Sequence, residues 1–179
     1  MLNLPNMITL ARVILVPIFI IVSINQDFGW ALLIFAIAAV SDAVDGLLAR
    51  LLQQRTVLGS YLDPVADKLL TASAYVILAI LNILPGWLTV IVISRDVLII
   101  LGIMLLFLTS HPLEIRPSLA SKLTTILQFC TVVSTLVSQY AFSIPFLIDF
   151  LIWGTAVATV ISGLQYIGRG IKIFNQGTA

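Results

Sequence analysis

The sequence predicts an all-α protein, a polytopic integral membrane bundle of six transmembrane helices with a polar cavity at its cytoplasmic side. Of the 179 residues, 60% come from the apolar set AVILMFWYC and 9% are charged. Soluble domains average about 45–50% apolar and about 25% charged residues, so this chain cannot cover a water-facing surface. Its apolar residues form runs long enough to cross a bilayer. We expect residues 1–179 to form a single membrane domain.

Six apolar runs, separated by polar residues or by Pro and Gly, set the expected spans. They cover residues 7–24, 29–48, 64–84, 87–108, 119–137 and 145–167. The third and fourth runs are separated only by the segment Leu84-Pro85-Gly86. We therefore expect a tight turn there, which makes these two spans an antiparallel helical hairpin.

Basic residues set the expected orientation. The connections after the first, third and fifth spans contain no Lys or Arg, whereas the opposite side carries Arg50, Arg55, Arg116, Lys122, Arg169 and Lys172. By the positive-inside rule, both termini and this charged side are cytoplasmic. The net charge of +1 leaves no basic excess to neutralise phosphates, so nucleic acid is excluded as a partner.

Three further basic residues fall inside expected spans, near their cytoplasmic ends: Arg12, Lys68 and Arg95. Ionisable groups within a membrane segment are costly, and they commonly mark a water-filled functional cavity. The cytoplasmic half of the bundle should therefore contain a polar pocket.

Half of the acidic residues fall in one short stretch. Four of eight lie within residues 42–67, namely Asp42, Asp45, Asp63 and Asp67. In a helix, the first two are spaced i,i+3 and the last two i,i+4, so each pair lies on one helix face. The intervening turn would bring the two pairs together.

Four converging carboxylates repel one another, so they either take up protons or bind cations. Oxygen ligands without His or Cys suit Mg²⁺ or Mn²⁺, and two such ions serve displacement at phosphorus in many enzymes. Gly46 and Gly59 would allow close approach of a ligand, and Arg50 supplies a forked donor for phosphate. The alternative for either Asp pair alone is a helix cap or a solvated interface.

The chain resembles the CDP-alcohol phosphatidyltransferases in the motif Asp42-x-x-Asp45-Gly46-x-x-Ala49-Arg50, followed after eight residues by Gly59-x-x-x-Asp63-x-x-x-Asp67. These integral membrane enzymes move a phosphatidyl group from CDP-diacylglycerol to an alcohol and release CMP. The six-span plan extends the resemblance over essentially the whole chain. The resemblance to this family also implies two divalent ions per active site and a homodimer.

The resemblance implies roles for the motif residues. Asp42, Asp45 and Asp63 would be metal ligands, and Asp67 would be both a shared ligand and the general base for the acceptor hydroxyl. The residues that would cradle the cytidine and diphosphate are Gly46, Ala49, Arg50 and Gly59. Similar PNxxTxxR openings in the family face the diphosphate, so we assign a substrate contact to Asn6, Thr9 and Arg12. An interfacial cap with a snorkelling arginine is the alternative for that segment.

Three basic residues are candidates for binding an acceptor phosphate: Arg95, Lys122 and Arg116. A structural pair of Arg95 with Asp96 is the alternative, but adjacent helical residues point about 100° apart and do not face each other. Lys122 could form an anion pocket with Arg95 beside the metals, or it could be a positive-inside anchor. Arg116 lies in the preceding loop.

Two alcohols are candidates for the acceptor, phosphatidylglycerol and glycerol 3-phosphate. Phosphatidylglycerophosphate synthases, which use glycerol 3-phosphate, usually carry a second arginine in the fourth span and a GKxKT stretch before the fifth. This chain has RDVLIILGIMLLF and SKLTT instead, which resemble the CMP-forming cardiolipin synthases. We therefore rank phosphatidylglycerol ahead of glycerol 3-phosphate as the acceptor. From other classes, a small cation transporter would not require the glycine, alanine and arginine positions of the motif. An inactive membrane scaffold is disfavoured because four uncompensated carboxylates are costly to keep.

Overall fold

The computed structural model describes residues 4–51, 57–108 and 119–176, and it describes side chains within residues 11–41, 68–102 and 119–168. The described chain contains six α-helices and no strand, which confirms the all-α prediction. The helices are α1 (Leu4–Ile24), α2 (Phe28–Leu51), α3 (Val57–Ile80), α4 (Gly86–Leu108), α5 (Leu119–Tyr140) and α6 (Pro145–Gln176).

Two helices end in the same way, at a residue in the left-handed conformation. Asn82 has a φ of 57°, and the carbonyl oxygen of Leu78 accepts hydrogen bonds from the amides of Ile83 and Leu84. This Schellman arrangement satisfies carbonyls that a helix end leaves without partners. It stops α3 at Ile80, earlier than the expected 84. The turn of the hairpin is therefore longer than expected. Gln26, with a φ of 62°, ends α1 similarly.

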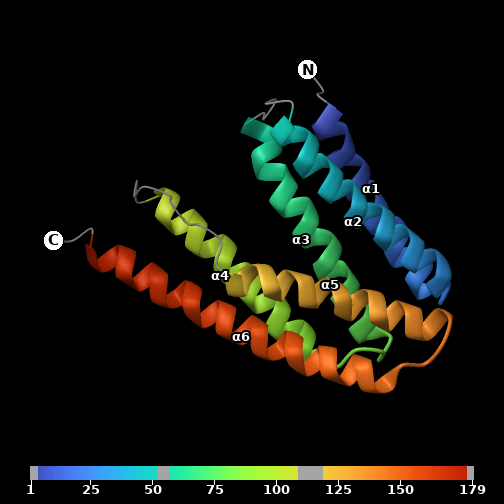
Figure 1. Cartoon of the computed structure of the whole chain (residues 1–179). Coiled ribbons are helices and arrows are strands. Elements are labelled where there is room, and N and C mark those ends of the chain that lie inside the picture. Colours follow the sequence, from blue (N-terminus) through green and yellow to red (C-terminus); the bar gives the residue numbers. More distant parts are fainter. Residues whose placement is uncertain (1–3, 52–56, 109–118, 177–179) are drawn as a thin grey trace.

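The helices form two groups that diverge toward the chain ends (Figure 1). The first group is α1, α2 and α3, which contact one another in every pairing. The second is α4 and α6, which also contact each other. Between the groups lies α5, which contacts α2, α3 and α6, while α3 and α4 pack as the expected antiparallel hairpin.

Small and aromatic side chains fill the core of the first group. Ala31, Ala38 and Ala74 are fully buried, and residues without bulky side chains let helix backbones approach closely in membrane proteins. Phe19 and Phe35 fill the space beside them, with ring centroids 5.8 Å apart. This packing fixes α1 and α2 against α3, so it sets the positions of the helix turns that carry the motif.

Many polar side chains of the described residues are buried, and many large apolar side chains are exposed. The fully buried polar residues on α5 and α6 are Thr124, Gln128, Thr131, Thr135, Thr155, Thr159 and Ser162. The Thr131 and Thr155 hydroxyls lie 2.8 Å apart across the two helices. Outward-facing side chains include Phe146, 87% exposed, and Trp153, 65% exposed. This distribution suits a hydrocarbon solvent, in which polar groups must find partners inside the protein.

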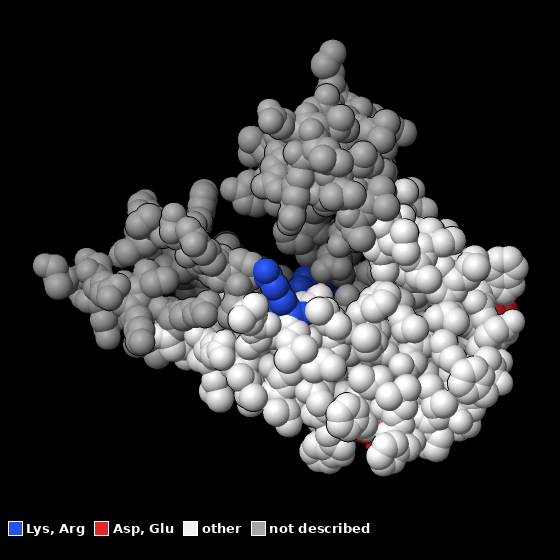
Figure 2. Space-filling model, in the orientation of Figure 1, with Lys and Arg blue, Asp and Glu red and all other residues white. Residues whose placement is uncertain are grey.

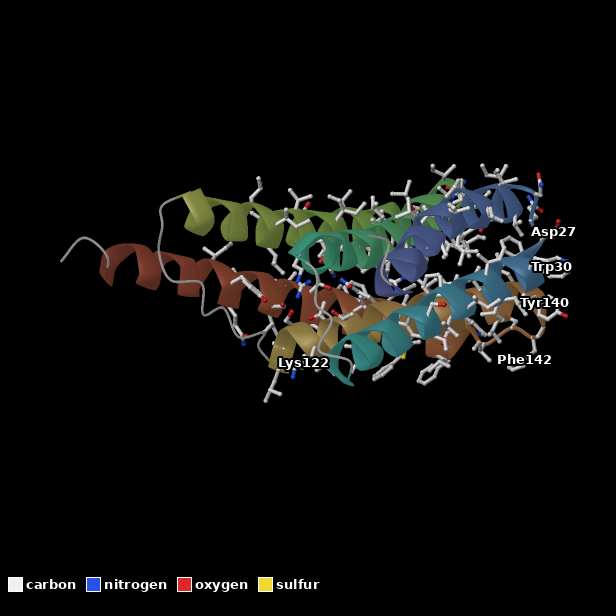
Figure 3. The ribbon with its side chains drawn as sticks, turned by 90° about the horizontal axis from the view of Figure 1, so that it is seen from above. Asp27, Trp30, Lys122, Tyr140 and Phe142 are labelled. Carbon is white, nitrogen blue, oxygen red and sulfur yellow. The ribbon has the colours of Figure 1, made fainter. Side chains whose placement is uncertain are left out.

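Two helices of the described chain are long and apolar enough to cross a membrane, Leu119–Tyr140 and Pro145–Gly168. Three more are apolar but shorter over the described residues, namely Ala11–Ile24, Phe28–Ser41 and Lys68–Ile80. The remaining spans of the six-span plan stay predictions. Trp30, Tyr140 and Phe142 lie together with Asp27 at one end of the molecule, whereas Lys122 lies toward the other (Figure 3). Aromatic residues are typical of a membrane interface.

Candidate active site

The four motif carboxylates lie on two helices that contact each other. Asp42 and Asp45 belong to α2, and Asp63 and Asp67 belong to α3. The predicted i,i+3 and i,i+4 spacings are therefore helical spacings. The side chains of these residues lie outside the described ones, as do those of Asn6, Thr9, Gly46, Ala49, Arg50 and Gly59.

Both pairs lie at similar distances along the chain from the 52–56 connection. Asp45 lies six residues before Leu51, the last described residue of α2, and Asp63 lies six residues after Val57, the first described residue of α3. At 1.5 Å per residue, each is roughly 9 Å along its helix from the end that faces the 52–56 connection. By the same reckoning, Asp42 and Asp67 lie at roughly 14–15 Å. The helix geometry thus supports one four-carboxylate group.

Arg12 lies at a similar height in α1. It is eight residues after the start of the helix at Leu4, which is roughly 12 Å along the axis. Its side chain is only 1% exposed, and α1 contacts both helices that carry the carboxylates. A buried guanidinium is stable only when it is matched by negative charge and hydrogen bonds. This burial argues against the interfacial snorkelling alternative for Arg12.

Arg95 joins three helices through its guanidinium. Its Nη1 donates to Asp96 Oδ1 at 2.7 Å, and its Nη2 donates to Ser121 Oγ at 2.6 Å and to Ser162 Oγ at 2.9 Å. The expectation that adjacent residues Arg95 and Asp96 do not pair is wrong, because the long arginine side chain reaches back to the carboxylate. Arg95 is 4% exposed, and its Nε has no hydrogen-bond partner in the described part of the chain.

A second cation shares the same carboxylate. Lys68 Nζ lies 3.0 Å from Asp96 Oδ1, so one oxygen atom accepts from both Lys68 and Arg95. Lys68 directly follows Asp67 in α3. Two of the basic residues within the expected spans therefore form a buried ion cluster with Asp96 between α3 and α4. The polar pocket itself stays a prediction.

The described Lys and Arg side chains visible in Figure 2 gather where the surface is hollowed. Lys122 lies in the first turn of α5, next to Ser121, which binds Arg95. Arg116 lies outside the described residues. Cationic side chains gathered in one hollow suit an anionic ligand.

An apolar groove of about 290 Å³ lies between α2, α3 and α5. Its walls include Phe35 and Ala39 from α2, Leu70 from α3, and Thr125 and Phe129 from α5. Ala39 precedes Asp42 by three residues, and Leu70 follows Asp67 by three. The groove is thus about one helical turn from the motif on both helices.

The donor set fits a hard divalent cation. Four carboxylates supply only oxygen ligands, as Mg²⁺ and Mn²⁺ prefer, and they come from two adjoining helices. Among the residues with described side chains, no group of three His, Cys, Asp or Glu could hold a metal ion.

The sequence profile of one family matches residues 2–161, which include both motif helices and the buried cations. The chain belongs to the CDP-alcohol phosphatidyltransferase family. This membership confirms the resemblance that the motif carries and makes the protein an enzyme.

Relatives of this CDP-alcohol phosphatidyltransferase include both candidate kinds of enzyme, glycerol-3-phosphate phosphatidyltransferases and cardiolipin synthases. A CDP-diacylglycerol–glycerol-3-phosphate 3-phosphatidyltransferase of Bacillus subtilis is 34% identical, over 94% of this chain and 95% of its own. A CMP-forming cardiolipin synthase of Homo sapiens is also 34% identical, over 95% of this chain and 62% of its own. The chain thus spans less than two thirds of the human protein. A CMP-forming cardiolipin synthase of Streptomyces coelicolor is 32% identical, over 97% of this chain and 78% of its own.

The sequence does not predict three residues of this phosphatidyltransferase's network around Arg95: Asp96, Ser121 and Ser162. Helical geometry alone disfavours a pair of Arg95 with Asp96. Ser121 lies beside Lys122, which is a usable signal. Nothing in the sequence connects Ser162 to Arg95, which precedes it by 67 residues.

Proposed function

We propose that this enzyme transfers the phosphatidyl group of CDP-diacylglycerol to a hydroxyl group of phosphatidylglycerol, forming cardiolipin and releasing CMP. The acceptor oxygen would form a bond to the phosphatidyl phosphorus while the bond from that phosphorus to CMP breaks. Asp67 would take the hydroxyl proton. The observation that carries the proposal is the complete motif on α2 and α3, with both Asp pairs at similar distances along the chain from the 52–56 connection.

Different residues would bind the metal ions and the CDP group. Two Mg²⁺ or Mn²⁺ ions would be held by Asp42, Asp45, Asp63 and Asp67, and such ions supply charge neutralisation at the phosphates. We assign the cytidine and diphosphate to Gly46, Ala49, Arg50 and Gly59, together with Asn6, Thr9 and Arg12. Holding donor and acceptor in one orientation supplies much of the expected rate gain.

The apolar groove supports a lipid substrate. Its walls are mostly hydrocarbon and aromatic, and it lies about one helical turn from the carboxylates. An acyl chain in this groove would bring its phosphate to the motif. The groove opens beside exposed apolar residues such as Ile126, 59% exposed, so a lipid could enter from the bilayer.

The hydrogen bonds that Arg95 already makes support phosphatidylglycerol as the acceptor. Three hydrogen bonds to protein side chains already engage its guanidinium, which leaves fewer donors for a dianionic headgroup. Phosphatidylglycerol carries a single bridging phosphate with less charge. The alternative is glycerol 3-phosphate, as in the name of the Bacillus subtilis relative. Family membership favours either transferase over the cation transporter.

We propose further that the enzyme crosses the membrane six times, with both termini and the active site on the cytoplasmic side. The basic residues that flank the spans support this orientation, and the exposed apolar surface supports contact with lipid. A homodimer is the assembly that the family resemblance implies.

The deciding experiment supplies purified enzyme and CDP-diacylglycerol with phosphatidylglycerol and glycerol 3-phosphate in parallel reactions, and identifies the lipid product by mass spectrometry. We expect cardiolipin and CMP from the first reaction. Phosphatidylglycerophosphate from the second, without cardiolipin from the first, would select the alternative. The absence of CMP in both reactions would contradict the proposed function.

A further inference from the structure

Asp96 carries one negative charge between two positive ones. Its Oδ1 lies 3.0 Å from Lys68 Nζ and 2.7 Å from Arg95 Nη1. The side chains of Asp96 and Arg95 are 9% and 4% exposed and that of Lys68 is 25% exposed, so water screens the Arg95–Asp96 contact poorly and reaches the Lys68 end in part. Two cations held against one oxygen atom in a largely buried site need the shared carboxylate.

The network reaches four helices. Lys68 belongs to α3 and both Arg95 and Asp96 to α4, while Nη2 of Arg95 donates to Ser121 of α5 and Ser162 of α6. The guanidinium carbon of Arg95 also lies 5.9 Å from the centre of the Tyr166 ring, within range of a cation–π contact. Asp96 therefore holds Arg95 at the junction of α4, α5 and α6.

Each end of this network adjoins a residue of the proposed reaction. Lys68 is the residue after Asp67, the proposed base. Ser121 is the residue before Lys122, a proposed acceptor contact. A shift of Lys68 would therefore move the helix turn that carries the proposed base. A shift of Arg95 would disturb Ser121 and thus the helix turn that carries Lys122. Arg95 Nε is buried and has no hydrogen-bond partner among the described residues.

We propose that Asp96 is a positioning residue for the acceptor: its carboxylate holds Lys68 and Arg95 in the arrangement that receives the acceptor's phosphate. This inference rests on the proposed function. Without the carboxylate, the two cations would repel each other and leave this arrangement. The acceptor would then bind less well, whereas CDP-diacylglycerol, which is bound by the motif on α2 and α3, would be little affected.

The test compares KM for phosphatidylglycerol, KM for CDP-diacylglycerol and kcat in Asp96→Asn and Asp96→Glu. We expect Asp96→Asn to raise KM for phosphatidylglycerol about tenfold or more, and KM for CDP-diacylglycerol less than about threefold. Asp96→Glu should recover part of the loss, because it restores the charge. Asp27→Asn is the matched control, since Asp27 is exposed at the other end of the molecule.

A second pair of variants separates positioning from stability. Thr131→Val removes a buried hydrogen bond away from the network, so it should lower stability without changing either KM. If Asp96→Asn does not fold, the double variant Lys68→Gln with Asp96→Asn removes one charge of each sign and serves in its place. We expect the double variant to show the raised KM for phosphatidylglycerol as well.

The outcomes are distinct. A folded Asp96→Asn protein, or the folded double variant, with a KM for phosphatidylglycerol within about twofold of the Asp27→Asn control would overturn the positioning role. Equal increases in both KM values would overturn it too. Wild-type enzyme that releases no CMP would overturn the proposed function, and the inference with it.

Discussion

Arg95 is the side chain at which α4, α5 and α6 meet. Its guanidinium contacts a carboxylate and two hydroxyl groups in a fixed fork, which a lysine could not reproduce because its ammonium is a single point charge. Burial makes each of these hydrogen bonds costly to break. The same residue therefore ties the bundle together and keeps positive charge beside the motif.

Asp67 is the residue on which the proposed chemistry depends most. Asp67→Asn keeps the size of the side chain and removes its ability to accept a proton. We expect the variant to fold normally and to lose turnover by roughly 10²–10⁴-fold, the usual contribution of general base catalysis. The measurement is CMP release under saturating substrates, with Asp27→Asn as the control. Full activity in Asp67→Asn would show that another group takes the proton.

The groove between α2, α3 and α5 can be tested through neighbouring residues of one helix. Ala39 lines the groove, whereas the next residue, Val40, is 62% exposed on the outside. Ala39→Phe should fill the groove and raise KM for long-chain CDP-diacylglycerol more than KM for a short-chain analogue. Val40→Phe adds a ring outside the groove and should leave both values unchanged. Equal behaviour of the two variants would argue against an acyl chain in the groove.

The contact between α5 and α6 depends on buried hydroxyl groups. Thr131→Val keeps the shape of the side chain but removes its hydrogen bond to Thr155. We expect a loss of about 1 kcal/mol in the free energy of unfolding, as is typical of such bonds within membranes. Unfolding in detergent micelles measures it. Thr125→Val on the same helix is the control, because the exposed Thr125 hydroxyl donates to the carbonyl oxygen of Ser121 within α5. A larger loss in the control would contradict this role for the α5–α6 contact.

At the scale of the whole molecule, much of the fold could be predicted because bilayer-spanning helices follow from hydropathy alone. The starts of α4 and α6 fall at or next to the expected residues, Trp87 and Pro145. The end of α3 could not be predicted as well. Apolar residues continue past Ile80, but the left-handed Asn82 and its neighbours turn the chain away.

The sequence predicts the motif carboxylates of the site better than it predicts the partners of Arg95. The spacing of Asp42, Asp45, Asp63 and Asp67 predicts that each pair lies on one helix, because that spacing follows from local periodicity. Their metal chemistry stays a prediction. The partners of Arg95 could not be predicted. Ser121 and Ser162 follow it by 26 and 67 residues, and only tertiary packing brings them together.

The proposed orientation predicts where the chain ends lie. With an even number of spans, both termini should be on the cytoplasmic side. Green fluorescent protein, which fluoresces in the bacterial cytoplasm, should be fluorescent when fused to the C-terminus, whereas alkaline phosphatase, which needs the periplasm, should be inactive there. The same two reporters inserted after Asn25 should give the opposite result. An active phosphatase at the C-terminus would contradict the six-span plan or its orientation.

The central claim is that four carboxylates on α2 and α3 serve phosphatidyl transfer with divalent metal ions. Its most direct measurement is CMP release from CDP-diacylglycerol by purified enzyme with phosphatidylglycerol, before and after chelation and after addition of Mg²⁺ or Mn²⁺. We expect CMP release that stops on chelation and returns with either ion. No CMP release with any alcohol acceptor, or release that persists undiminished after chelation, would contradict the account.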